Sequence, residues 1–550
     1  MRILLIIPPY RTTDALVSQL YPMPLGQVYL ATVLRAAGHV VWVEDFLTPA
    51  QRHKTPAPQS FAGKRAPAYL HYGRPIDECL RWLDANLDRF DAVGLASCQC
   101  PIYETVEQIA AAVVRRGKPL VVGGPFATTA TDEVRRRFRA NVVVRFEGEN
   151  VAAEAFERAT AGERDVVLDG GRVDFESLPA PDWTVAPPER YPRFGSRIRG
   201  VLTASRGCPW SCEFCSVHTV MTRRYRSLSR DAIADQLTRL WALGVSYFCF
   251  LDDNLFLTDA RVDAVLGAVE DCCRRIPKFR RRGRFYMEEG MEVRMAAKPG
   301  VLSRIVAAGF DNVALGVETI NAAYLRAARK PYDPEIMDAA IEQCREVGLT
   351  VKAFYIIGFP GDTLESVADD LVRFASFGME ARPNNLKLYP GTAVTAAYRE
   401  RGWIGDDYDW RLSTFYTPDS GNLTYAQIRR LKTYLGAFGV AAGQFGVNLV
   451  ADPPDRIVAA AERAGYRIAG TADGSVAIRG NMYRATPYQY IAEIMSLRRG
   501  VAGAIATQTD RTTVVSRPVR APRDEFQAAI RRAMARVASP GVRTGAADGG

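Results

Sequence analysis

Histidine is scarce in this chain, and two common signatures are missing. Four of the 550 residues are histidines, and no histidine-centred catalytic triad can be recognised. The first apolar run, residues 2–7, is not followed by a G-x-G-x-x-G fingerprint, which disfavours a nicotinamide or flavin cofactor. This run is also too short for a signal peptide and ends in Pro8-Pro9, so we expect a buried first strand. Because no apolar stretch reaches about 18 residues, we expect no membrane span.

The charge and the scattered cysteines exclude further classes. The formal net charge is +10, but its arginines are spread through helical segments such as 135–137 and 280–282 rather than interleaved with aromatic residues. We therefore expect no nucleic-acid partner, although the charge would suit an acidic substrate or an acidic electron-donor protein. Seven of the ten cysteines are dispersed, at positions 79, 98, 100, 249, 272, 273 and 344. Such dispersal is typical of a reducing compartment and predicts a cytoplasmic protein.

The other three cysteines form the one dense cluster of the chain. Cys208, Cys212 and Cys215 have the spacing C-x-x-x-C-x-x-C. Three thiolates can hold three irons of a 4Fe–4S cluster and leave the fourth iron open to a small molecule. A structural zinc site would need a fourth ligand, for which His218 is the nearby candidate. A disulfide would leave one cysteine unpaired.

Residues 1–155 alternate between apolar strands and helical patterns. This alternation predicts an α/β fold with a Rossmann-like, doubly wound parallel sheet. Residues 48–75, which are rich in proline and basic residues, are predicted to form a long irregular insertion. Ligands of such sheets bind beyond the carboxyl ends of the strands. The candidate residues there are Pro9, Ser97, Gly123, Gly124, Pro125, Phe126, Gly148 and Glu149.

A second alternation follows a proline-rich linker predicted at 156–195. Residues 196–402 contain six strand–helix units, which predict a partial (β/α)6 barrel, with the fourth strand at 312–317 and the sixth at 385–389. Chemistry in barrels lies at the carboxyl ends of the strands. The candidates at these ends are Asp252, Asp253, Arg294, Glu318 and Gly358.

The pattern changes again after residue 402. A helix at 425–439 and a hairpin signal at 471–474 predict a small α+β domain over 403–537 that closes the mouth of the barrel, followed by a disordered tail at 538–550. An aromatic group in this domain either lines a substrate cavity or belongs to the core. Its members are Tyr408, Trp410, Phe415 and Tyr416.

The cysteine motif, with Phe214 before its last cysteine, resembles the signature of radical S-adenosylmethionine (SAM) enzymes. The resemblance implies that SAM chelates the open iron and that reduction releases a 5′-deoxyadenosyl radical. It also implies that Asp252 or Asp253 contacts the amino group of SAM and that Glu318 lies near its ribose. Gly358 would let the adenine approach. Arg294 and Lys330 are either partners of the SAM carboxylate or members of ordinary salt bridges.

The N-terminal region is similar to the cobalamin-binding domain fused to many radical SAM enzymes. The similar segments are 24–39, 121–125 and 146–149. One departure is that no histidine lies in the Asp-x-His-x-x-Gly context that supplies a cobalt ligand in cobalamin mutases. We therefore expect cobalamin without histidine on cobalt. Its lower face would meet water or a side chain from 97–103 or 69–74.

Together these resemblances imply a cobalamin-dependent (class B) radical SAM methyltransferase. One SAM would methylate cobalamin, and a second would generate the radical that activates a carbon of a small-molecule, natural-product intermediate. The electron donor implied is a ferredoxin or flavodoxin. Two alternatives stay open: a non-methylating relative that rearranges or cyclises its substrate, and a cofactor-binding protein without catalysis. A methylthiotransferase would need a second cluster, for which Cys79, Cys98 and Cys100 are too closely spaced.

Overall fold

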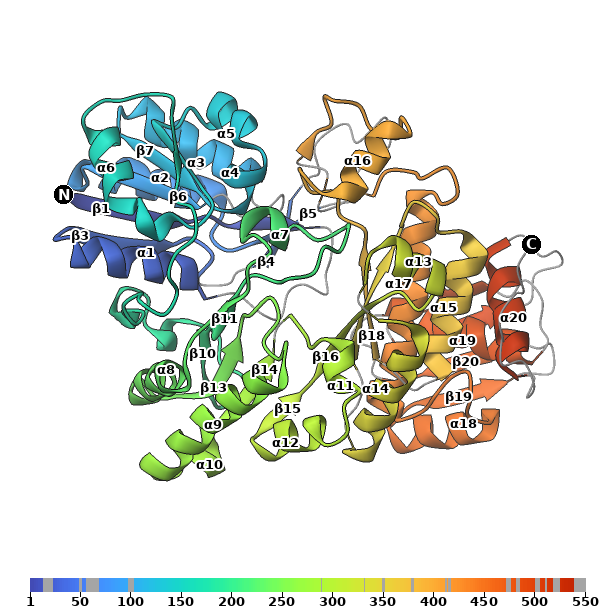
Figure 1. Ribbon diagram of the computed structural model, residues 1–550. Helices are drawn as coiled ribbons and strands as arrows, with labels where there is room; N and C mark the ends of the chain where they lie inside the picture. Colours follow the sequence, from blue (N-terminus) through green and yellow to red (C-terminus); the bar gives the residue numbers. More distant parts are fainter. Residues whose placement is uncertain are drawn as a thin grey trace, which may run out of the picture. The chain divides into compact units, whose positions relative to one another are not determined.

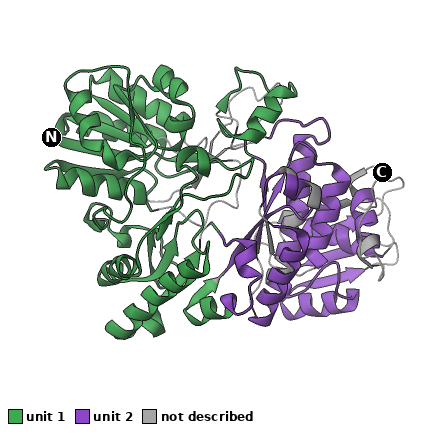
Figure 2. Ribbon diagram, in the orientation of Figure 1, with its two compact units in different colours: residues 1–289, 303–312, 387–416 green, residues 290–302, 313–386, 417–550 purple. Residues whose placement is uncertain are grey.

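A computed structural model describes the chain in segments (Figure 1). The described residues are 1–12, 23–48, 52–55, 69–96, 103–287, 289–330, 332–348, 352–376, 380–410, 413, 417–470, 476–480, 485–499, 505–509, 512–517 and 525–538. They divide into two compact units (Figure 2). The first unit contains residues 1–289, 303–312 and 387–416, and the second contains residues 290–302, 313–386 and 417–550. Each unit is described by itself.

A six-stranded parallel sheet begins the first unit, which confirms the α/β class with parallel strands. Its spatial order is β3-β1-β6-β7-β8-β9. The strands are β1 (Arg2–Ile7), β3 (Val40–Asp45), β6 (Ala92–Ala96), β7 (Leu120–Gly123), β8 (Val142–Arg145) and β9 (Val166–Asp169). The helices of this region are α1 (Leu25–Ala36), α2 (Ile76–Asn86), α3 (Tyr103–Arg115), α4 (Pro125–Thr129), α5 (Thr131–Phe138) and α6 (Ala152–Thr160).

Helices on both faces explain why the strands are apolar throughout. Leu4 and Ile6 belong to a core built with α2, α3 and α5. Alternate side chains of a strand point to opposite faces. Leu5 accordingly lies on the other face, where a Cβ added to Gly94 would lie 2.6 Å from Leu5 and 2.8 Å from Phe156 of α6. The sheet is therefore doubly wound.

The strand order defines where a ligand would bind. Numbered along the chain, the strands lie in the order 2-1-3-4-5-6, so the winding reverses between β1 and β6. Crevices at such a switch point, beyond the carboxyl ends, are the usual ligand sites of open α/β sheets. Pro9 lies just after β1, and Gly124 directly follows β7.

Two predictions for this region were wrong in detail. The segment predicted as an irregular insertion contains β4 (Arg52–Thr55) and β5 (Tyr69–Tyr72), which form an antiparallel sheet with β2 (Tyr10–Thr12) in the order β2-β5-β4. Pairing between distant segments leaves little local signal, so these short strands were missed. The parallel sheet also extends beyond residue 155, because β9 lies within the predicted linker.

The first unit also contains a second parallel sheet, β10-β13-β14-β15. Its strands are β10 (Ile198–Leu202), β13 (Val245–Phe250), β14 (Arg284–Met287) and β15 (Phe310–Asn312), with helices α8 (Arg230–Ala242), α9 (Asp259–Arg275) and α10 (Phe279–Arg282). Aromatic rings pack on this sheet: Phe285 lies 5.4 Å from Phe248 and 5.2 Å from Phe310, measured between ring centroids. The short elements β11 (Ser205–Arg206), β12 (Arg226–Ser227), α7 (Val217–Val220) and α16 (Ala393–Glu400) complete the unit.

The second unit combines a parallel and an antiparallel sheet. The parallel strands are β16 (Ala314–Glu318), β17 (Lys352–Ile357) and β18 (Glu380–Asn385), and the antiparallel sheet has the order β19-β20-β22-β21. The latter strands are β19 (Arg467–Gly470), β20 (Val476–Arg479), β21 (Ile505–Gln508) and β22 (Thr513–Arg517). The helices are α11 (Val293–Ala296), α13 (Ala322–Ala327), α14 (Pro334–Glu346), α15 (Leu364–Ser376), α17 (Tyr425–Val440), α18 (Pro454–Arg463), α19 (Ala485–Arg498) and α20 (Glu525–Ala538), while α12 (Val301–Ala307) contributes to both units.

The strands predicted for the barrel differ in two places. The fourth is divided into β15, which pairs with β14, and β16, which pairs with β17. The sixth lies at 380–385 and not at 385–389, because Asn385 already aligns with Ile357, the last residue of β17. Residues 386–389 run past the end of that partner. A barrel joining the two parallel sheets stays a prediction, as does a cap at its mouth.

The region predicted as one C-terminal domain, 403–537, is shared between the units, with the division between residues 416 and 417. The predicted tail, 538–550, lies outside the described residues except for Ala538. Among the helices that the structure describes, none has the length and apolarity to cross a bilayer.

A buried carboxyl group ties α15 to the loop after β16. The Oδ2 atom of Asp370 accepts hydrogen bonds from the Tyr355 hydroxyl (2.9 Å) and the Thr319 hydroxyl (3.1 Å). Burial raises the pKa of Asp370 to about 7, although these donors oppose the shift. An unfolded aspartate titrates near pH ~3.9, so the native state alone holds this proton between about pH 4 and 7. The contribution of Asp370 to stability is therefore complete below the unfolded pKa and is lost as the pH rises through about 7.

We expect the free energy of unfolding of Asp370→Asn to fall less between pH 5 and pH 8 than that of the parent protein. Asparagine keeps an acceptor oxygen for Tyr355 and Thr319 but cannot ionise. Urea unfolding of the cofactor-free protein at both pH values measures the effect, with the half-exposed Asp338→Asn as control. An Asp370→Asn protein with the same pH dependence as the parent would contradict this explanation.

Candidate functional site

The three cysteines lie on a loop whose ends are pinned together. Strands β11 and β12 pair antiparallel, Arg206 opposite Arg226, and so close the segment that carries the thiols. Within it, the Cys215 amide donates to the Cys212 carbonyl (3.1 Å), and α7 starts two residues after Cys215. The Asn254 side-chain amide approaches the Cys208 sulfur at 4.0 Å. The sequence folds this loop by local turns, and distant carboxylates fix its stem.

The chemistry of these donors fits an iron–sulfur cluster. Burial raises the pKa of the Cys215 thiol to about 12 and also raises that of Cys208, so thiolates here need a cationic partner. Among the described residues, no three side chains of Cys, His, Asp or Glu converge on a point that could hold one metal ion. A cubane cluster needs no such convergence, because each thiolate binds a different iron. The set therefore fits a 4Fe–4S cluster.

The two aspartates after β13 have different roles. Asp252 is buried, accepts the Ala204 amide at both oxygens (3.0 and 3.1 Å) and accepts the Ser205 hydroxyl (2.6 Å). Burial raises the pKa of Asp252 to about 7 and also raises that of Asp253. Asp253 binds the Gly207 amide through Oδ2 (3.0 Å), and no hydrogen bond is recorded for its other oxygen among the described residues. Asp252 therefore holds the stem of the loop, whereas Asp253 has one carboxylate oxygen left that could bind a cation.

Gly207, which precedes the first cysteine, cannot be another residue. Its φ is +81°, and a Cβ would lie 2.7 Å from the carbonyl oxygen of Arg224. Only glycine adopts such a backbone at little cost, and this close approach leaves no room for a side chain.

A buried ionic cluster that the sequence did not reveal lies beside this stem. Arg206 Nη1 binds Glu147 (3.0 Å) and Glu149 (2.8 Å), and Arg226 binds the second oxygen of Glu147. The guanidinium carbon of Arg206 lies 4.9 Å from the centroid of the Tyr29 ring and 4.6 Å from that of the Phe175 ring. Glu147, Glu149 and Tyr29 each lie 57 or more residues before Arg206 in the sequence. No local motif therefore predicts the cluster. Glu149, a predicted ligand residue, is thus an ion-pair partner of Arg206.

The other predicted ligand residues of the first sheet surround its carboxyl edge. The Pro9 carbonyl accepts the Thr105 hydroxyl (2.5 Å), which fixes the chain after β1. Gly124 has a φ of +109° and starts α4, where Phe126 packs edge-on against Tyr103 at 5.2 Å. Ser97 lies outside the described residues. The described members of the predicted set therefore occupy one edge of the sheet.

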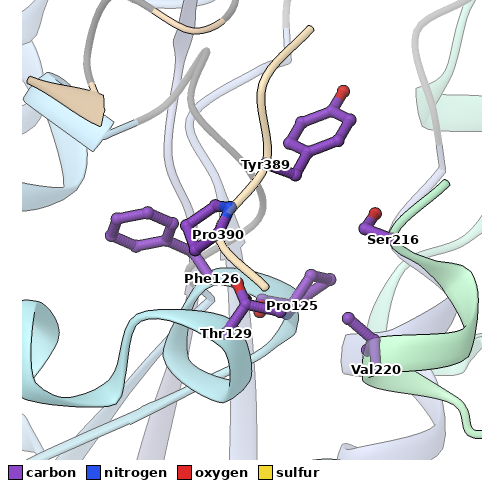
Figure 3. A pocket seen from close by; sticks show the side chains of 7 residues that line it. All are labelled: Pro125, Phe126, Thr129, Ser216, Val220, Tyr389 and Pro390. Atoms are coloured by element: carbon purple, nitrogen blue, oxygen red, sulfur yellow. Dashed lines mark hydrogen bonds between the residues drawn. The ribbon is translucent and has the colours of Figure 1, made fainter. Parts of the chain in front are cut away.

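This edge and the cysteine loop are neighbours within the first unit (Figure 3). A small cavity of about 10 Å³ is lined by residues of three segments that are distant in sequence. They are Pro125, Phe126 and Thr129 of α4, Ser216 and Val220 at α7, and Tyr389 with Pro390. The backbone of the loop is also tied to α16, because the Val394 amide donates to the Glu213 carbonyl (3.1 Å). The helix that follows the predicted cobalamin glycines thus faces the helix that follows the cysteines.

Predicted residues of the second unit are held in ion pairs. Glu318 is partly buried at the end of β16 and has a φ of +63°, a conformation that is uncommon for non-glycine residues. Its carboxylate lies 3.4 Å from Lys330 Nζ, and burial raises its pKa against the effect of Lys330. Arg294 pairs with Glu292. Lys330 and Arg294 thus each have an acidic partner, and contact of either with the SAM carboxylate stays a prediction.

Gly358 is supported by an aspartate that the sequence analysis overlooked. Gly358 has a φ of +108°, and a Cβ there would lie 3.0 Å from Thr417. Asp362 accepts the amides of Gly358 (2.7 Å) and Phe359 (2.9 Å) and so fixes the turn after β17. An acidic residue four positions after the glycine could have signalled this turn.

The aromatic group for which a substrate cavity or the core was considered belongs in part to the core. Trp410 packs against the hydrophobic core of the first sheet, and Tyr408 lies 5.2 Å from it. Phe415 and Tyr416 lie outside the described residues. Trp410 thus contributes to the core, and a substrate cavity lined by this group stays a prediction.

Comparison with known proteins finds a family model and several relatives that match this chain. The model of the radical SAM superfamily matches residues 202–373. An uncharacterized methyltransferase of Pyrococcus horikoshii is 25% identical over 403 residues, which cover 68% of this chain and 78% of the relative. Bacteriochlorophyllide d C-8(2)-methyltransferase of Chlorobaculum tepidum is 24% identical over 374 residues, which cover 64% and 78%.

A solved structure shares the fold. The radical S-adenosylmethionine methyltransferase TsrM of Kitasatospora setae, with cobalamin and a 4Fe–4S cluster bound, has a TM-score of 0.57 and 16% identity. The match covers 80% of this chain and 94% of TsrM.

We expect Cys212→Ala to abolish incorporation of the cluster. Removing one of the three thiolates leaves a second iron of the cluster without a protein ligand. Iron content and the visible absorbance of anaerobically reconstituted protein measure the loss. Cys273→Ala, a half-buried thiol on α9, is the control and should keep its iron. Equal iron content in the two variants would exclude Cys212 as a ligand.

Proposed function

Since this chain is a radical SAM enzyme, with a 4Fe–4S cluster and S-adenosylmethionine as cofactors, we propose that it is a cobalamin-dependent methyltransferase acting on an unactivated carbon of a small molecule. The observation that carries the proposal is the proximity of α4 and α7 within one unit. A methyl donor at the edge of the first sheet and a radical source at the cysteine loop would then serve one substrate.

Cys208, Cys212 and Cys215 are the proposed ligands of the cluster. When bound, the cluster with SAM supplies a carbon-centred radical that abstracts hydrogen, and cobalamin supplies the methyl group. Asp253, through its remaining oxygen, is the proposed partner of the SAM ammonium group, because a carboxylate beside an open iron attracts that cation. Asp252 is assigned instead to the stem of the loop. Glu318 is proposed near the ribose and Gly358 at the adenine, both from the family resemblance.

The glycines at the edge of the first sheet support a cobalamin ligand. A Cβ on Gly123 would lie 3.6 Å from Val144, and one on Gly148 would lie 3.5 Å from Leu30 and Val144. These are ordinary van der Waals contacts, and neither glycine has a positive φ. The fold itself therefore does not require glycine at these positions, whereas a large flat ligand approaching the backbone does.

His71, in the 69–74 segment considered for the lower face of cobalamin, supports binding without its imidazole on cobalt. His71 in β5 is buried, with Nδ1 accepting from Arg11 (3.4 Å) and Nε2 at 2.7 Å from the Arg74 carbonyl. Both ring nitrogens are thus engaged. This agrees with the missing Asp-x-His-x-x-Gly context of the sequence.

The relatives make methyl transfer the leading reaction. Two of them are methyltransferases by name, and that of Chlorobaculum tepidum acts on a carbon of a bacteriochlorophyllide. The proposed substrate is accordingly a small-molecule, natural-product intermediate, with electrons supplied by a ferredoxin or flavodoxin.

The test is a product analysis with anaerobically reconstituted, cobalamin-loaded protein. Methyl transfer predicts S-adenosylhomocysteine, 5′-deoxyadenosine and methionine, with a substrate heavier by one methylene. Formation of 5′-deoxyadenosine with a product of unchanged carbon count would favour a rearrangement or cyclisation. Absence of SAM cleavage under reduction would favour the non-catalytic alternative.

We expect Gly148→Ala to weaken cobalamin binding about tenfold or more while leaving the thermal stability of the cofactor-free protein nearly unchanged. The added methyl group meets only ordinary protein contacts but occupies space next to the proposed ligand. Gly94→Ala is the contrast, because its Cβ would overlap Leu5 and Phe156 and lower the melting temperature. Unaltered cobalamin affinity in Gly148→Ala would place the ligand elsewhere.

A further inference from the structure

We propose that Arg206 is a positioning residue that fixes the cysteine loop against the Gly148 loop, so that the two cofactors are held at a working separation. This inference rests on the proposed function. Arg206 stands two residues before Cys208, and its two carboxylate partners, Glu147 and Glu149, flank Gly148 on either side. One guanidinium thus joins the segment that would hold the cluster to the segment that would face cobalamin.

The contacts of Arg206 restrict it in every direction. Its Nη1 atom is shared between Glu147 and Glu149, and Tyr29 and Phe175 lie against the guanidinium. Tyr29 is itself held by a hydrogen bond from Gln236 (3.2 Å). The side chains of Arg206, Glu147 and Glu149 are only 11%, 2% and 8% exposed. The guanidinium of Arg206 is therefore held in one position by both its ion pairs and its ring contacts.

The cluster joins two arginines and two glutamates, and the Asp253 carboxylate is close enough to interact with both arginines. Glu147 accepts Arg206 on one oxygen, and on the other it accepts Arg226 and the Val173 amide (3.0 Å). Arg226 lies opposite Arg206 in the β11–β12 pair, so both strands of the stem are bound to the same carboxylate. The stem cannot shift relative to β8 without separating buried charges.

Stability alone does not account for such a cluster. Buried ion pairs cost desolvation free energy, and apolar side chains of similar volume are often equally stable or better. A charge that is hydrogen-bonded to two carboxylates instead fixes the direction and the distance between the segments that it joins. The Gly207 amide, bound to Asp253, continues this fixed geometry to the first cysteine.

The experiment compares Arg206→Gln and Arg206→Lys with Arg135→Gln. Arg135 makes an ion pair of two hydrogen bonds with Asp165 on the surface of the same sheet and is a matched control. Iron and cobalamin contents are determined first. Two properties are then measured: the ratio of 5′-deoxyadenosine to methylated product, and amide hydrogen exchange in residues 146–150 and 205–208 of the cofactor-free protein.

A positioning role predicts that Arg206→Gln raises this ratio about tenfold, because a misplacement of about 1 Å can cost ~100-fold in rate. Arg206→Lys should restore part of the coupling, and Arg135→Gln should change nothing. Amide hydrogen exchange should be faster in Arg206→Gln than in the parent protein, both at residues 146–150 and at residues 205–208. Glu147→Gln removes the charge of the partner and should likewise speed exchange at residues 205–208. An unchanged ratio at full cofactor content would overturn the role.

The two proposals can fail separately. Wild-type protein that forms no methylated product contradicts the proposed function, and hydrogen exchange then decides the role of Arg206. Exchange that rises at 205–208 but not at 146–150 in Arg206→Gln contradicts a link between the loops. If Arg206→Gln does not fold, the ratio and exchange of Arg206→Lys decide between the same outcomes.

Discussion

The site depends on the acceptance of backbone amides by buried carboxylates. Asp252 binds the Ala204 amide and the Ser205 hydroxyl, and Asp253 binds the Gly207 amide, immediately before the first cysteine. A cysteine-rich loop without regular structure has few ways to satisfy its own amides, and unpaired amides are costly when buried. Carboxylates at the end of a neighbouring strand solve this problem from outside the loop. The same solution recurs in the second unit, where Asp362 accepts the amides of Gly358 and Phe359.

Charge is therefore used in two ways in this protein. On the surface, many arginines form exposed pairs with nearby acids, such as Arg81 with Asp77, and such pairs contribute little. Around Arg206, buried charges connect segments that are far apart in sequence. The net charge of +10 gives no indication of this difference, because it counts exposed and buried arginines alike.

The sequence was informative wherever the signal was local. The apolar runs predicted the parallel sheet, and the spacing of Cys208, Cys212 and Cys215 predicted the loop. The β4 and β5 strands, the division of the fourth barrel strand at Val313 and the true position of β18 were not predictable, because each depends on which distant strand is the partner. For the same reason the ionic role of Arg206 was missed, whereas the partners of Asp362 are local and its spacing after Gly358 could have signalled the turn.

The glycines at the edge of the first sheet have a consequence for how such proteins diverge. Gly123 and Gly148 have room for a methyl group by the contacts of the fold. If the proposed ligand binds at this edge, a single-base change from glycine to alanine would weaken its binding and leave a stable sheet behind. A substitution at these positions could thus affect binding of the ligand without affecting the stability of the fold. A descendant could keep the whole architecture and lose the proposed ligand, and under that proposal glycine at these two positions would distinguish a ligand-binding member from one that binds none.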